Sequence, residues 1–498
     1  MVSEKQPKSD HRSRPSGKEF REFIASGWAP RDETLPDAAE VAAWTPARRE
    51  ALSQAFPGER LVIPAGGLKV RSNDTDYVFR PHTAFAYFTG LGADREPDAV
   101  LVLEPVDGGH EPILYFRPLA PRDSEEFFAD SRYGEFWVGS RPTLESMAAE
   151  LGIATRHIEQ FADAVAKDVG SLSVRVIRDA DAEIAGLIDT VRAEAGQSEQ
   201  EALTAADLEL ARHCSTMRLV KDDWEADQMR LACEGTAHAF EAVVADLPEA
   251  KSRGRGERWV EGVFGLYARH HGNGVGYDSI CAAGDHANTL HWIRNTGDLR
   301  DGDLLLLDAG IEVDSLFTAD VTRTLPVSGT FSDVQRRIYD AVYAAQCAGI
   351  EACRPGNRFK DVHAAAIRVI AEHLHEWGFL PEGIDVEATL DPENGQYHRR
   401  WMVHGTSHHL GLDVHDCAQA LREDYMDAEL TPGMVLTVEP GLYFKTDDEL
   451  VPPEFRGNGV RIEDDILITK DGCENLSAML PRRSDEVEAW MARILEGR

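Results

Sequence analysis

The stretch DLLLLDAGIEVDSLFTADVTRTLP, residues 303–326, contains two β-strand patterns that each carry an aspartate. Four leucines at 304–307 precede Asp308, and a β-branched run follows Asp320. Two such runs joined by a short polar connection are typical of a β-hairpin. The pattern therefore predicts a hairpin on which Asp308 and Asp320 can face each other. Taken alone, either aspartate is more often a turn residue or a helix cap than a metal ligand.

A histidine-rich segment lies further along the chain. HGTSHHLGLDVHD, residues 404–416, contains four histidines: His404, His408, His409 and His415. Imidazole is a common metal ligand and a common acid or base near neutral pH. The spacing of four between His404 and His408 matches the first two ligands of a zincin helix, but Gly405 stands where a zincin requires glutamate. The segment therefore predicts a metal or acid–base site of another kind, with structural histidines as the alternative.

Two glutamates accompany strand patterns closer to the C-terminus. In TPGMVLTVEPGLY, residues 431–443, Glu439 directly precedes a proline, which cannot continue a central β-ladder. In GVRIEDDILIT, residues 459–469, strict alternation places Arg461 and Glu463 on one face of a predicted strand. The glutamate side chains are therefore expected where strands end or face a site, although one Arg–Glu pair alone is usually an ordinary salt bridge.

Together, these segments supply four carboxylates beside apolar strands, with histidines between them in sequence. Clustered carboxylates repel one another unless cations neutralise them. Two divalent ions balance four carboxylates, and one neutral imidazole can complete the ligand set. Oxygen-rich ligation with a single histidine favours Mn²⁺, with Co²⁺ or Zn²⁺ as alternatives. The combined pattern predicts a site for two divalent metal ions.

The ordered set of motifs strongly resembles the creatinase/aminopeptidase, or pita-bread, metallopeptidases. DAG with DVTRTLP, HGTSHHLGLDVHD, VLTVEPGLY and RIEDD are similar to the Xaa-Pro aminopeptidase (aminopeptidase P) branch. RSNDTDYVFR at 71–80 and AYFTGL at 86–91 resemble the N-terminal domain of that branch. The resemblance implies a tail at 1–44, a creatinase-like α/β domain at 45–200 and an α+β pita-bread catalytic domain at 201–485.

The resemblance also implies a role for each matching residue. The implied metal ligands are Asp308, Asp320, His408, Glu439 and Glu463, of which Glu463 bridges the two ions. Hydroxide held between the ions would attack the peptide, and Glu439 would take up the proton of the water. The other implied catalytic residues are His291, His404, His415 and Arg461, and the implied substrate-binding residues are Tyr277, His291, His404 and His415. Arg461 would hold Glu463 or a neighbouring carboxylate in place.

The implied reaction removes the N-terminal residue from peptides that have proline in the second position. A prolidase, which cleaves Xaa-Pro dipeptides with the same metal set, is the nearest alternative. A catalytically inactive pita-bread binding module is a remote one, because such modules have lost the ligands retained here. By family analogy, we expect a homodimer or homotetramer.

The spacing of the two aspartates departs from the family pattern. Most members have eleven residues from one aspartate to the other, whereas Asp308 and Asp320 are 12 positions apart (320 − 308). We expect the extra residue to form a bulge around Val313–Phe317, which would keep Asp320 facing the site. Asp314 is a competing candidate.

The remainder of the chain fits two domains. Residues 45–195 alternate helix and strand patterns, as in an α/β layer structure. The chain turns polar at 196–204, where we place the linker. A long helical pattern covers 207–243, and later strand patterns are separated by helical patterns near 333–352 and 360–377.

Composition excludes several classes of protein. The chain has 498 residues, of which 43% are apolar, and a formal net charge of −35. It can bury a large core, and its acidity disfavours a nucleic-acid partner. No segment reaches the roughly 18–20 apolar residues of a membrane span, so we expect no membrane partner. The N-terminus lacks the apolar core of a secretory signal, and seven cysteines are scattered without a C-x-x-C motif, which favours the cytoplasm.

Overall fold

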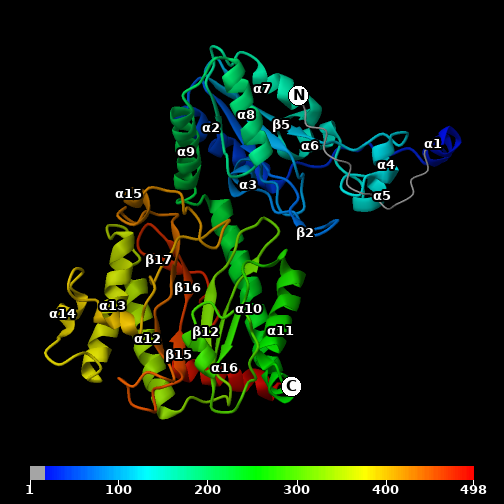
Figure 1. Ribbon diagram of the computed structural model, residues 1–498. Helices are drawn as coiled ribbons and strands as arrows, with labels where there is room; N and C mark the ends of the chain where they lie inside the picture. Colours follow the sequence, from blue (N-terminus) through cyan, green and yellow to red (C-terminus); the bar gives the residue numbers. More distant parts are fainter. Residues whose placement is uncertain (1–16, 498) are drawn as a thin grey trace. The chain divides into compact units, whose positions relative to one another are not determined.

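A computed structural model of the protein describes residues 17–497, which form two compact units (Figure 1). The first unit ends at Asp207 and the second begins at Leu208, inside helix α9 (Gln200–Met217). The predicted boundary at residues 200 and 201 lies at the start of this helix. The predicted domain ranges remain proposals, and most of the polar N-terminal segment, residues 1–16, lies outside the described residues.

The first unit is built on a mixed five-stranded sheet with the strand order β6-β5-β4-β1-β7. β1 pairs antiparallel with β4 and parallel with β7, whereas β5 pairs antiparallel with β4 and parallel with β6. The strands are β1 (Arg60–Pro64), β4 (Val100–Val106), β5 (Gly109–Phe116), β6 (Ala154–His157) and β7 (Val174–Val176). Valines such as Val62, Val100 and Val176 are fully buried, because both faces of the sheet's centre are covered.

Helices and a small hairpin complete the first unit. Helices α7 and α8 pack on each other, and Phe161, Val165 and Ile188 from these helices join the valines of the sheet in one apolar core. The elements are α2 (Thr45–Ala55), β2 (Val70–Ser72), β3 (Thr75–Asp76), α3 (Thr83–Thr89), α4 (Glu125–Ala129), α5 (Glu135–Val138), α6 (Leu144–Leu151), α7 (Phe161–Ala166) and α8 (Ala182–Glu194).

Part of the predicted tail docks on the first unit. Helix α1 (Lys18–Ala25) precedes the short 3₁₀ helix η1 (Glu40–Ala43). Phe20 contacts Phe128 edge to face at 5.5 Å between ring centroids, and Trp28 contacts Phe127 at 5.9 Å. These contacts give the apolar segment at 20–28 a packed position beside α4.

The second unit contains two three-stranded antiparallel sheets and two shorter pairs of strands. The sheet orders are β12-β10-β9 and β13-β16-β17, and the pairs are β11-β8 and β14-β15. The strands are β8 (Gly274–Val275), β9 (Ile280–Ala283), β10 (Leu304–Ala309), β11 (Ile311–Glu312), β12 (Val321–Pro326), β13 (Val435–Val438), β14 (Gly441–Phe444), β15 (Asn458–Arg461), β16 (Asp464–Ile468) and β17 (Cys473–Asn475).

Two pairs of helices flank these strands. In Figure 1, the strands lie between the pair α10–α11 and the pair α12–α13, and the members of each pair pack on each other. The helices of this unit beyond α9 are α10 (Asp223–Ser252), α11 (Gly256–His271), α12 (Asp333–Ala352), α13 (Phe359–Glu376), α14 (Val386–Leu390), α15 (Arg422–Tyr425) and α16 (Ser484–Glu496), and the 3₁₀ turns are η3 (Gly284–Asn288) and η4 (Tyr397–Arg400).

The hairpin of β10 and β12 keeps one register from its strands to its turn. Asp308 pairs with Thr322, and nearer the turn Glu312 pairs with Thr318. The turn closes at Leu316, whose φ is 75°. The expected bulge was therefore wrong: the described pairs of this hairpin show no shift in register. Because the spacing of 12 is even, simple alternation already places both aspartates on one face.

Two other predicted elements are interrupted. The strand predicted over 459–469 divides into β15 and β16, which belong to different sheets. The helix predicted over 207–243 divides into α9 and α10, because Asp222 caps a new helix start by accepting from the N–H of Glu225 at 2.9 Å.

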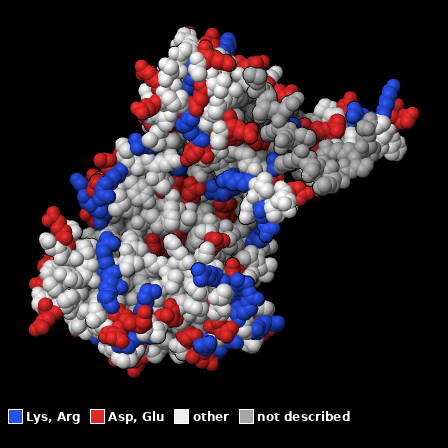
Figure 2. Space-filling model, in the orientation of Figure 1, with Lys and Arg blue, Asp and Glu red and all other residues white. Residues whose placement is uncertain are grey.

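The surface carries both signs of charge despite the acidic total. Figure 2 shows acidic and basic side chains interspersed on the face that it draws. Surface pairs include Arg230 with Glu474 at 2.7 Å and Arg95 with Glu150 at 2.9 Å. Within residues 17–497, none of the helices combines the length and the apolar character that a membrane crossing requires.

Candidate active site

One cavity of the second unit brings the predicted site residues together. Its volume is about 720 Å³. All ten residues predicted from the sequence line it: Tyr277, His291, Asp308, Asp320, His404, His408, His415, Glu439, Arg461 and Glu463. Asp314, the competing candidate, is not among the lining residues. Sequence motifs far apart in the chain therefore meet at one place.

Backbone pairing explains why His408 and Glu439 meet. The N–H of Thr437 on β13 donates to the carbonyl of His408 at 2.9 Å, and the N–H of Glu439 donates to the carbonyl of Thr406 at 2.8 Å. The histidine segment thus runs beside β13 like an added strand. It carries His408 to the end of β13, where Glu439 emerges.

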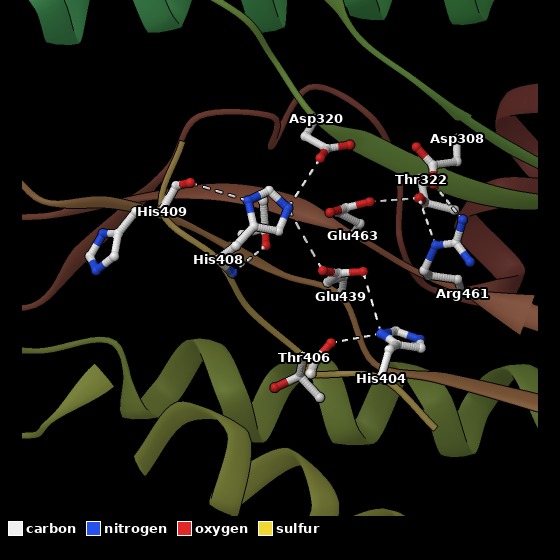
Figure 3. A network of polar contacts seen from close by, with 12 residues as sticks. Asp308, Asp320, Thr322, His404, Thr406, His408, His409, Glu439, Arg461 and Glu463 are labelled. Atoms are coloured by element: carbon white, nitrogen blue, oxygen red, sulfur yellow. Dashed lines mark hydrogen bonds and ion pairs between the residues drawn. The ribbon is translucent and has the colours of Figure 1, made fainter. Parts of the chain in front are cut away.

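A second backbone contact places Glu463 beside the aspartate hairpin. The N–H of Glu463 donates to the carbonyl of Thr322 at 3.0 Å, which joins the two three-stranded sheets at this point. The interruption between β15 and β16 leaves Glu463 free of either strand's ladder. Its carboxylate therefore lies next to those of the hairpin (Figure 3).

The predicted metal ligands converge closely. Asp320, His408 and Glu463 each offer a ligand atom, and these atoms lie within 4.8 Å of one another. Nε2 of His408 lies 3.3 Å from Oδ2 of Asp320 and 3.8 Å from Oε1 of Glu439 (Figure 3). Asp308 completes the group from the neighbouring strand. The five predicted ligand residues thus form one cluster with oxygen and nitrogen donors.

Arg461 pairs with Asp308 rather than with Glu463. Its Nη2 atom donates to Oδ2 of Asp308, and its Nη1 atom donates to the hydroxyl of Tyr443 at 3.0 Å. The hydroxyl of Thr322 holds Glu463 instead, donating to Oε2 at 2.6 Å (Figure 3). We predicted that Arg461 holds Glu463 or a neighbouring carboxylate. In the structure its partner is the neighbouring carboxylate, Asp308.

Three residues that support the site were missed as functional residues. Thr322 lies two residues after Asp320 on one face of a strand, so alternation was an available signal. Asp465 shares the predicted face of Glu463, and its Oδ2 accepts from the backbone N–H of Asp320 at 3.0 Å. Tyr443 forms a hydrogen bond with Nε2 of His404 at 2.7 Å, and only its place in the EPGLY motif could have indicated it.

Burial raises the pKa of three carboxyl groups of the cluster. Burial, with the neighbouring Asp320 and Glu439, raises the pKa of Glu463 well above its usual range. Burial also raises the pKa of Glu439 to about 8, although His408 and Arg461 oppose the rise. The pKa of Asp308 is raised by burial and by Asp320, against the pull of Arg461. The positive charges of His408 and Arg461 therefore do not balance the negative charge of the clustered carboxylates.

The histidines divide into two groups. Burial disfavours the charged form of His408, but the hydrogen bond to Asp320 and the charges of Asp320 and Glu439 outweigh it and raise the pKa to about 9. Burial and Arg461 lower the pKa of His404 to about 3. Burial and His408 lower the pKa of His415. The acidic cluster therefore stabilises the protonated form of His408, whereas His404 and His415 are neutral imidazoles at neutral pH.

The donor set fits divalent cations. Carboxylates that burial and mutual repulsion force toward protonation become favourable ligands once a cation supplies positive charge. Oxygen donors with one imidazole suit Mn²⁺, Co²⁺ or Zn²⁺. The cluster thus has the chemistry of a metal centre.

Comparisons with known proteins agree with this geometry. The model of metallopeptidase family M24 matches residues 227–470, and that of the aminopeptidase P N-terminal domain matches residues 46–177. Xaa-Pro aminopeptidase 1 of Streptomyces coelicolor is 53% identical over 479 residues, which cover 96% of this chain and 92% of that protein. The chain belongs to metallopeptidase family M24. M24 membership makes it a hydrolase and accounts for the buried carboxylate cluster.

Solved structures of M24 relatives share the fold of the chain. The low-pH form of Escherichia coli aminopeptidase P has a TM-score of 0.79 and 32% identity, covering 91% of this chain and 98% of that one. A zinc-substituted form of the same enzyme in complex with product also has a TM-score of 0.79, at 32% identity, covering 92% and 99%. The predicted fold, an aminopeptidase P-type domain before a pita-bread M24 domain, is confirmed.

Proposed function

We propose that this M24 protein removes the N-terminal residue from peptides that have proline in the second position. The observation that carries the proposal is the convergence of five metal-ligand side chains with three histidines in one cavity. The 53% identity to a protein named Xaa-Pro aminopeptidase supports the choice of substrate. Methionine aminopeptidases and creatinase-type enzymes share the fold, but the retained ligands and the first domain favour the Xaa-Pro branch.

We also propose two divalent ions per subunit, most favourably Mn²⁺. Asp308, Asp320, His408, Glu439 and Glu463 would hold them, and the zinc-substituted neighbour shows that a related site accepts a divalent metal. Bound ions would supply hydroxide at neutral pH and polarise the peptide carbonyl. Glu463, whose Oε2 accepts from Thr322 at 2.6 Å, would contact both ions, as the family resemblance implies.

Glu439 is the proposed proton acceptor. Its two oxygens lie 3.8 Å from Nε2 of His408 and 3.7 Å from Nδ1 of His404, so it stands between a proposed metal ligand and a proposed substrate-binding residue. A carboxylate in this place can take a proton from water and pass it toward the departing amine. That transfer matters because a proline nitrogen must acquire a proton when its amide bond breaks.

The proposed substrate-binding histidines have the protonation that this role needs. His404 and His415 are held neutral by burial, so each ring offers one N–H donor and one acceptor. The N–H of a neutral His415 can stabilise a developing oxyanion, whereas the ring nitrogens of His404 contact the carbonyl of Gly405 at 2.6 Å and the hydroxyl of Tyr443 at 2.7 Å. His291 is exposed at the cavity wall, where a peptide can reach it. Tyr277 lines the cavity beside the two aspartates, Asp308 and Asp320.

The deciding experiment compares an Ala-Pro-Ala tripeptide with an Ala-Pro dipeptide, using metal-free protein to which Mn²⁺ is added. Faster hydrolysis of the tripeptide, with release of free alanine, is the expected result. Exclusive cleavage of the dipeptide would replace this proposal with a prolidase. Absence of hydrolysis of both would support the inactive binding module instead.

We further propose a cytoplasmic homo-oligomer. The seven cysteines are free thiols in the described structure, as expected for a reducing compartment. Sedimentation velocity of the full chain would distinguish a monomer from the dimer or tetramer expected by family analogy.

A further inference from the structure

A single buried carboxylate holds a segment of the cavity wall from behind. Glu257, on α11, has no exposed surface. Its Oε1 atom accepts from the N–H of Ala283 at 2.8 Å and contacts Nδ1 of His286 at 2.6 Å. Its Oε2 atom accepts from Nε1 of Trp292 at 2.9 Å and from the N–H of Gly297 at 2.5 Å. Four hydrogen bonds thus converge on one side chain.

These partners bracket the segment that carries His291. Ala283 and Gly297 stand at its two ends, and Leu290, His291 and Ile293 from its middle line the catalytic cavity. His291 itself is exposed, so no surrounding core fixes its position. The position of the His291 ring therefore depends on how the segment is anchored.

The packing around Glu257 leaves the segment little freedom. The backbone N–H of Glu257 donates to the carbonyl of Gly297 at 3.1 Å, so side chain and main chain hold the same residue. A Cβ atom at Gly297 would come within 2.7 Å of Oε1 of Glu257. The rings of His286 and Trp292 stack at 3.9 Å between centroids. Anchor and segment therefore fit each other closely.

We propose that Glu257 is a positioning residue that fixes His291 for the reaction. The inference rests on the proposed function, in which His291 contacts the substrate. A misplacement of a contacting group by about 1 Å can cost about 100-fold in rate, so an anchor of this kind can matter as much as a contacting residue. Glu257 acts only through the segment at 283–297, because it does not line the cavity.

The test replaces Glu257 by glutamine, which keeps the size of the side chain. One acceptor oxygen becomes an NH₂ group, so two of the four donors lose their partner. We expect kcat/KM for Ala-Pro-Ala to fall about 10- to 100-fold, while bound Mn²⁺ stays near that of the control. Trp292→Phe, which removes one donor and keeps the ring, should cause a smaller fall.

The control and a second readout separate positioning from general damage. Glu225→Gln changes another buried carboxylate of the second unit, one that accepts from the N–H of Asp222 at 2.9 Å and does not line the cavity. Hydrogen–deuterium exchange should become faster at 284–297 in Glu257→Gln and not in Glu225→Gln.

The possible outcomes distinguish a failure of this inference from a failure of the proposed function. The inference alone would be overturned if the wild type is active and Glu257→Gln equals Glu225→Gln in kcat/KM and in hydrogen–deuterium exchange at 284–297. Loss of bound Mn²⁺ in proportion to the loss of activity would also overturn it, because the effect would then be structural. A wild type that hydrolyses neither peptide would overturn both.

Discussion

Asp308 and Asp320 lie on the same face of one β-hairpin. Asp308 pairs with Thr322, and Asp320 lies two residues before Thr322, so their side chains share a face. The hydroxyl oxygen of Tyr277 lies within hydrogen-bonding distance of both carboxylates, 2.7 Å from Oδ1 of Asp308, and can donate its single proton to either of them. A cation bound by the two aspartates would compete with the phenol for the same oxygens. The hydrogen bonds of Tyr277 should therefore matter most to the metal-free protein.

Replacing Tyr277 by phenylalanine tests this competition. We expect the metal-free protein to lose about 2 kcal/mol of unfolding free energy, because two buried carboxylates lose a donor. With Mn²⁺ present, the loss should be smaller, since the ions satisfy those oxygens. Urea unfolding with and without Mn²⁺ measures both values. Tyr339→Phe is the matched control, because the buried hydroxyl of Tyr339 has no hydrogen-bond partner within the described residues. An equal loss in both metal states would contradict the interpretation.

Thr322→Val should weaken metal binding without removing a ligand. The substitution keeps the shape of the side chain and deletes the hydrogen bond of 2.6 Å that orients Glu463. Loss of such an orienting partner typically costs about 10- to 100-fold in metal affinity or activity. Calorimetric titration with Mn²⁺ provides the measurement. Thr389→Val, which removes a buried hydroxyl bonded to the carbonyl of Asp385 at 2.9 Å, should leave the affinity within about twofold. Unchanged affinity in Thr322→Val would show that Glu463 needs no such support.

The metal-free protein should lose stability as the pH rises from 6 toward 9. The folded-state pKa is raised to about 8 for Glu439, from 4.5, and to about 9 for His408, from 6.5. Between the unfolded and folded values the native state binds more protons, so raising the pH favours unfolding. Mn²⁺ binding displaces these protons, and the increase in Tm that Mn²⁺ causes should therefore grow over the same range.

Thermal unfolding at several pH values, with and without Mn²⁺, measures this dependence. Glu439→Gln removes one of the two titrations, so its metal-free Tm should change less between pH 6 and 8 than that of the wild type. A wild-type Tm that rises with pH in the absence of metal would refute the assignment of raised pKa values to this cluster.

Glu439→Ala should abolish turnover and metal binding at one of the two sites. The variant removes both a ligand and the proposed proton acceptor, whereas Asp308, Asp320 and Glu463 keep their places on the strands. Elemental analysis after dialysis should find about one Mn²⁺ per chain instead of two, because one of the two proposed ions would lose a ligand. Hydrolysis of Ala-Pro-Ala at the wild-type rate would remove Glu439 from the mechanism.

Much of the catalytic cluster could be predicted from the chain alone. Strands such as Leu304–Ala309 and Val435–Val438 are short, apolar and bounded by polar residues, so local pattern was sufficient to find them. The even spacing of Asp308 and Asp320 also determines their shared face once the hairpin forms. The expected bulge was wrong because the extra residue is accommodated in the turn at Leu316, and the register of the two strands does not shift.

Tertiary structure decided which partner each charged group meets. Alternation along one strand placed Arg461 beside Glu463, yet the strand is interrupted between β15 and β16, and Arg461 pairs with Asp308, 153 residues earlier in the sequence. Thr322 and Glu463 meet only where two sheets join. Glu257 reaches the segment of His291 only because α11 packs behind it. Periodicity fixes the direction of a side chain within its own element, whereas its partner depends on how elements distant in sequence pack together.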